Sequence, residues 1–97
     1  MKEVKAVFKI DQSFNLSVGI VVSGHFIEGY PLIGYNFVVD IDGKPAAVKI
    51  TGVQRGNLDS EGKMLWGLLL HFDDPALGKI AETNRIKVQV VEIFAGL

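Results

Sequence analysis

The sequence predicts an all-β protein: a six- or seven-stranded antiparallel barrel, closed or partly open, with one short helical turn near residues 75–82. Three observations support this fold class. Apolar and polar residues alternate along most of the chain, which is the pattern of strands with one buried face. Glycine-containing turns separate these runs at regular spacing, as in small barrels and sandwiches. Hydrophobic residues fill 48% of the 97 positions, which suits a single domain over residues 1–97.

Seven short runs are expected to form the strands. They cover residues 4–10, 16–23, 25–28, 35–40, 46–54, 64–72 and 86–94. The run 64–72 is apolar almost throughout, so it is expected to be buried on both faces or to form one face of an interface. In the last run, Ile86, Val88 and Val90 are expected to share one side. The residues predicted to point into the barrel are Phe8, Ile10, Val18, Ile20, Val22, Val48, Ile50, Leu68 and Leu70.

Local signals fix the connections between these runs. Asp42 and Gly43 predict a type I′ hairpin turn, because both residue types tolerate positive φ. Gly52 lies inside a strand and predicts a bulge or a close backbone approach. Asp74 is expected to cap the short helix, with Pro75 in the first position, where its missing N–H group is not needed.

Charge and composition exclude several classes of function. Ten Lys and Arg residues against eleven Asp and Glu residues give a net charge of −1, which offers no bulk attraction for nucleic acid or for an anionic membrane. The absence of cysteine excludes disulfides, thiolate metal sites and a cysteine nucleophile. Charged residues interrupt the N-terminal stretch, and no run is apolar enough to span a bilayer, so we expect a cytoplasmic protein with no membrane contact.

The residues that carry chemistry form no strong motif. His25 and Glu28 have the H-x-x-E spacing of a metal site, but on a strand this spacing places them on opposite faces. A site that adds His71 from a distant strand is the open alternative. The paired carboxylates, Asp40 with Asp42 and Asp73 with Asp74, lie beside turns, where Asp is favoured for local hydrogen bonds. We therefore expect no catalytic or metal-binding residue.

Three Gly-Lys pairs raise the question of phosphate binding. They begin at Gly43, Gly62 and Gly78, and none is followed by Ser or Thr as a P-loop requires. We therefore expect no nucleotide and no other cofactor.

Two sets of surface residues are candidates for contact with a macromolecule. Basic residues that would form a stripe if their strands adjoin are Lys5, Lys9, Lys49, Arg55 and Lys87. Candidates for a protein interface are Tyr30, Leu32, Ile33 and Trp66. The competing interpretation is that the lysines are solvated residues that discourage edge pairing, and that Trp66 belongs to the core.

The order of these signals resembles the second domain of translational GTPases, the β-barrel that follows the G domain in elongation factor Tu and its relatives. The resemblance rests on residues 8–11 (FKID), 19–29 (GIVVSGHFIEG), 31–34 (PLIG) and 49–54 (KITGVQ), with the loop 58–62 and the strand 64–70. It implies the translation-protein type of barrel. This chain has no counterpart of the G domain, so GTP hydrolysis is not implied, and residues 74–77 depart from the family pattern.

These considerations predict a non-enzymatic binding module, a stand-alone barrel that engages a protein partner or a second copy of itself. The alternative, which the resemblance implies, is an RNA-binding accessory domain that acts at tRNA or the ribosome. A second alternative is a small enzyme or ligand binder with a site in the barrel mouth. A barrel of this size is expected to be filled by its own side chains, which disfavours an internal site.

Overall fold

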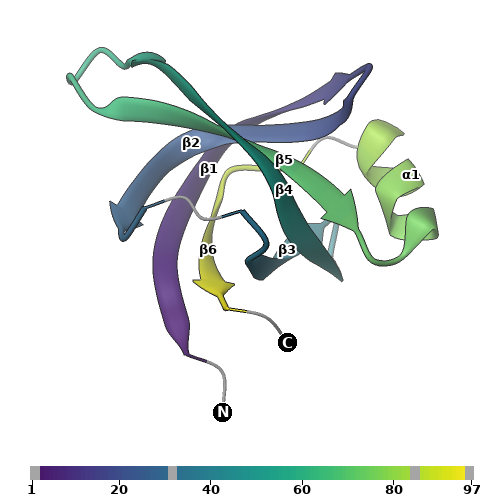
Figure 1. Ribbon diagram of the computed structural model, residues 1–97. Coiled ribbons are helices and arrows are strands. Elements are labelled where there is room, and N and C mark those ends of the chain that lie inside the picture. Colours follow the sequence, from purple (N-terminus) through teal and green to yellow (C-terminus); the bar gives the residue numbers. More distant parts are fainter. Residues whose placement is uncertain (1–2, 31–32, 84–85, 96–97) are drawn as a thin grey trace.

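The computed structural model describes residues 3–30, 33–83 and 86–95 (Figure 1). In this part of the chain, six antiparallel strands close into a barrel in the order β1-β2-β5-β4-β3-β6, with one short helix beside it. The elements are β1 (Val4–Leu16), β2 (Gly19–Glu28), β3 (Asn36–Ile41), β4 (Lys44–Leu58), β5 (Met64–Phe72), α1 (Pro75–Thr83) and β6 (Gln89–Phe94). The predicted small all-β barrel with a short helix is thus confirmed.

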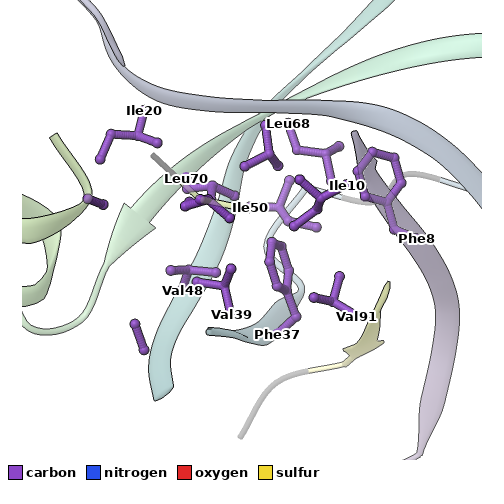
Figure 2. Close-up of a cluster of buried hydrophobic side chains, with 14 of the residues drawn as sticks. Phe8, Ile10, Ile20, Phe37, Val39, Val48, Ile50, Leu68, Leu70 and Val91 are labelled. Carbon is purple, nitrogen blue, oxygen red and sulfur yellow. The ribbon is translucent and has the colours of Figure 1, made fainter. Parts of the chain in front are cut away.

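The barrel core comes from the period-two pattern of the strands. Figure 2 shows Phe8 and Ile10 of β1 directed towards side chains from β3, β4 and β5. The fully buried large side chains are Phe8, Phe37, Ile10, Ile41, Ile50, Leu68, Ile93, Val22, Val39 and Val48. Eight of the nine residues predicted to face inward are buried.

Val18 is the exception, and the prediction for it was wrong. Its side chain is 71% exposed, because β1 continues to Leu16 and the chain turns at residues 17 and 18 before β2 begins at Gly19. The predicted strand 16–23 therefore starts three residues too early. At its other end, β2 runs without a break through the separately predicted run 25–28, which explains why the barrel has six strands and not seven.

The prediction for the last run holds for Val88 and Val90, which share the exposed side, and was wrong for Ile86. Val91 and Ile93 face the core, whereas Val88 and Val90 are exposed. Ile86 is buried as well, but it precedes β6, and its N–H donates to the hydroxyl of Ser13 at 3.0 Å. The alternation of buried and exposed residues is therefore interrupted between residues 86 and 89. The sequence gives no sign of this break, because apolar and polar residues continue to alternate there.

The strand β5 is buried on its inner face only. Leu68, Leu70 and Phe72 point into the barrel, while Gly67 and Leu69 on the outer face are partly exposed. Of the two predicted environments for this run, burial on both faces is excluded. The bulge predicted at Gly52 is present, because the register with β5 shifts between Ile50 and Gly52.

The predicted turn and helix cap are confirmed. Asp42 and Gly43 have φ values of 51° and 87°, as a type I′ turn requires. The carboxylate of Asp74 accepts the N–H of Ala76 at 2.9 Å, and Pro75 is the first helical residue.

Two hairpins of the barrel extend beyond the short strands β3 and β6. The short strand β3 covers only residues 44–49 of its neighbour β4, and the short strand β6 covers only residues 4–10 of its neighbour β1. Beyond these positions the hairpins β1–β2 and β4–β5 continue and project from the barrel (Figure 1). There β1, β2, β5 and β4 form a four-stranded sheet without β3 or β6 on its edges.

A side chain helps to join β3 to β6. Only Asn36 and Phe94 pair in register between these strands in the described chain. The amide of Gln89 accepts the N–H of Asp40 at 2.9 Å and donates to the Asp40 carbonyl at 3.0 Å. Gln89 therefore supplies the two hydrogen bonds that a paired residue would otherwise make.

Candidate functional site

The predicted basic residues do not form one continuous stripe. Lys5 and Lys9 lie on β1, whereas Lys49 and Arg55 lie on β4, and in the closed barrel two strands separate β1 from β4 in either direction. Lys87 lies on the β1 side, beside a surface hollow lined by residues 11–14 and 86–88. The strand that carries Lys5 and Lys9 therefore does not adjoin the strand that carries Lys49 and Arg55.

The lysines of β1 have acidic neighbours on the same strand or just before it. The ammonium of Lys5 lies 3.3 Å from Glu3, and that of Lys9 lies 3.9 Å from Asp11. These exposed pairs contribute little to stability, but they reduce the positive charge that this surface presents. On β4, the Nε of Arg55 donates to the sulfur of Met64 at 3.4 Å.

The predicted protein-interface residues have different environments. Tyr30 and Ile33 are exposed in the connection between β2 and β3, and Leu32 lies outside the described residues. Trp66 is partly buried and meets Phe26 edge to face, with ring centres 6.3 Å apart. Phe26 in turn contacts the core residue Phe8, with ring centres at 4.7 Å. Trp66 therefore extends the core, as the competing interpretation held.

An apolar hollow that was not predicted from the sequence lies over β2, β5 and β4. Its volume is about 230 Å³, and its lining residues are Leu16, Val18, Val21, Gly52, Val53, Gln54, Gly67 and Leu69. We call this hollow the outer groove. None of the described residues that line it is charged, and Leu16 and Val18 on its wall are among the exposed large hydrophobic residues. Because apolar residues gather at this exposed hollow, it is a candidate contact surface.

Two glycines contribute to the lining of the outer groove, and their local environments differ. A Cβ atom on Gly52 would lie 3.3 Å from the Cβ of Leu69, so this position is crowded by the chain itself. A Cβ atom on Gly67 would lie 3.4 Å from the nearest atom, Cγ1 of Val21, which is an ordinary contact. Gly67 also has no left-handed φ value, so its own fold does not require glycine there.

Part of the outer groove could be anticipated from the sequence. The apolar run 64–72 was a candidate for one face of an interface, and it supplies Gly67 and Leu69. The remaining wall comes from the β1–β2 turn and from β4, which are distant in the sequence. To predict that these segments meet, one needs the order of the strands in the barrel, and the pattern of apolar residues does not contain that order.

A small cluster of titratable groups lies where the β4–β5 loop approaches β2. The Nδ1 of His25 is 3.3 Å from a carboxylate oxygen of Asp11, without the alignment of a hydrogen bond. The pKa of Asp59 lies below its ordinary value of 3.8, chiefly because the carboxylate accepts the backbone N–H of Lys63, with Glu61 and His25 adding to the effect. The Asp59 carboxylate thus holds the loop by bonds at 2.8 Å to both N–H groups.

Within residues 3–30, 33–83 and 86–95, no three His, Asp or Glu side chains are grouped so as to hold a metal ion. In the same ranges, no helix has the length and apolar character needed to cross a membrane.

Comparison with known proteins adds no assignment. A scan against protein-family models and searches of curated proteins and of solved structures found no match. The resemblance to the second domain of translational GTPases stays a prediction, and a function has to be argued from the surface of the chain itself.

Proposed function

We propose that the protein is a non-catalytic binding module that contacts another protein surface through the outer groove. The observation that carries the proposal is the groove itself, a hollow with two glycines in its lining and no charge on the lining residues that are described. The barrel interior supports the same choice, because large side chains from all parts of the sheet fill it. A partner is therefore expected to bind on the outside of the barrel.

The proposal is tested by placing a photoreactive amino acid at a single position of the chain in its source cells. At Val18, on the groove wall, we expect a discrete crosslinked product, because this side chain is 71% exposed and borders the hollow. Leu58 is the matched control, since it is 60% exposed at the end of the other hairpin and does not line the groove. Absence of a product at Val18, or equal yields at both positions, would contradict the proposal.

The RNA-binding alternative rests on the basic residues and is tested separately. We expect labelled tRNA and ribosomal RNA fragments not to bind at either about 50 mM or about 200 mM salt, because tight RNA binding needs several clustered phosphate contacts. Lys49 and Arg55 lie on one side of the barrel and Lys5 and Lys9 on another. Micromolar binding at the higher salt, lost in a Lys49→Glu, Arg55→Glu double variant, would establish the alternative.

A further inference from the structure

The outer groove has a projecting apolar side chain at its own rim. Val18 is at the tip of the β1–β2 hairpin, where the chain turns, and it is the most exposed of the large hydrophobic residues described. The same residue forms part of the groove wall, so a projection and a hollow lie next to each other on one surface. We propose that a second copy of this chain occupies the outer groove, with Val18 of each copy lying against Gly67 in the groove of the other. This inference rests on the proposed function and names its partner.

Charge favours a second copy over an acidic or basic partner. The described residues that line the outer groove have no charged side chain, so they offer nothing to attract a partner of opposite charge. When two copies of this lining meet, its described residues bring no like charges together. Among the lining residues that the structure describes, the only polar side chain is the amide of Gln54, which both donates and accepts hydrogen bonds and can therefore pair with its own copy.

Gly67 supports a close approach of the second copy at this position. Glycine inside a strand weakens the sheet, and it is commonly retained where another backbone or a ligand comes near. Gly67 has room for a Cβ atom and has no left-handed φ value, so the folded chain alone does not explain it. It lies in the groove lining, where a side chain would reduce the space available to an incoming Val18.

The arrangement leads to a closed pair. Because the projection and the hollow belong to one surface, a two-fold axis lets each copy insert its Val18 into the other copy at the same time. Such an isologous contact uses both hollows and leaves no free end for further growth. The expected product is a dimer, not a filament.

The first test measures mass in solution by sedimentation equilibrium over a range of concentrations. We expect the wild-type mass to rise from that of the 10.6 kDa chain to twice that value. Val18→Glu places a charge in the apolar groove of the other copy, and Gly67→Val fills that groove with a side chain. Both variants should therefore stay monomeric. Leu58→Glu, which adds the same charge to the other hairpin, should dimerise like the wild type. Circular dichroism identifies a variant that has lost its fold.

The second test detects the contact itself and uses the absence of cysteine from the chain. Gln54 lines the groove and pairs in register with Gly67, so a thiol there leaves the glycine unchanged. A Val18→Cys variant mixed with a Gln54→Cys variant should form a mixed disulfide faster than a Leu58→Cys variant mixed with the same partner. A wild type that stays monomeric at all concentrations, or equal rates of disulfide formation, would overturn the inference. If the photocrosslink at Val18 then identifies a different protein, the proposed function still holds and only the inference of a second copy fails. If position 18 gives no crosslink either, both fail.

Discussion

Gly24 of β2 and Gly67 of β5 lie one register step apart on neighbouring strands, yet glycine has different causes at the two positions. Gly24 pairs with Trp66, and Gly67 pairs with Ser23. A Cβ atom on Gly24 would overlap the carbonyl group of Lys9, because β1 bulges between Ile10 and Gln12 as it passes β2. Gly67 meets no such obstacle. The fold itself therefore requires the first glycine, whereas the second meets no comparable obstacle within the chain.

Of the two glycines, Gly24 is the one whose replacement is expected to change the free energy of unfolding more. Gly24→Ala forces β1 away from β2 at the bulge, and such overpacking typically costs about 1–3 kcal/mol. Against a total stability of about 5–15 kcal/mol for a small domain, this is a substantial loss. We expect a lower urea midpoint with an unchanged slope, measured on dilute protein so that association does not contribute.

An unchanged midpoint for Gly24→Ala would break the comparison. It would mean that β1 moves aside at no cost, and that the close approach of the two strands does not determine the residue at this position.

The local features of the fold could be predicted from the sequence because their causes are local. The alternation of Phe8 and Ile10 with polar neighbours specifies a strand and its buried face. The positive φ values of Asp42 and Gly43 follow from the residue types at a tight turn. These inferences need only the conformational preferences of a few adjacent residues.

The errors in the prediction arose where neighbouring residues are equally apolar. Val90 and Val91 suit either face of a strand, so the sequence leaves the phase of β6 open, and the hydrogen bond from Ile86 to Ser13 helps to set where the alternation breaks. Val18 fits an apolar alternation as well as it fits the exposed tip of a hairpin. In both cases the deciding interactions involve a distant part of the chain or the length of the paired strand.

The candidate site was less accessible to prediction than the fold. A basic stripe required β1 to adjoin β4, and the closed strand order separates them. The outer groove joins a turn near residue 17 to strand residues near 53 and 67. Alternation identifies which residues leave the core, but it does not identify which of them become neighbours on the surface.

The smallest expected effect on stability belongs to Gly67. Replacing glycine by alanine where the backbone accepts it typically stabilises a protein by about 0.4–1 kcal/mol, because the unfolded chain loses freedom. Gly67→Ala meets this condition, since the nearest atom to the added Cβ is at 3.4 Å. We therefore expect a slightly higher urea midpoint for the dilute monomer, together with weaker self-association at high concentration. A destabilised monomer would show that the chain itself requires this glycine, and Gly67 would then no longer support a second copy in the outer groove.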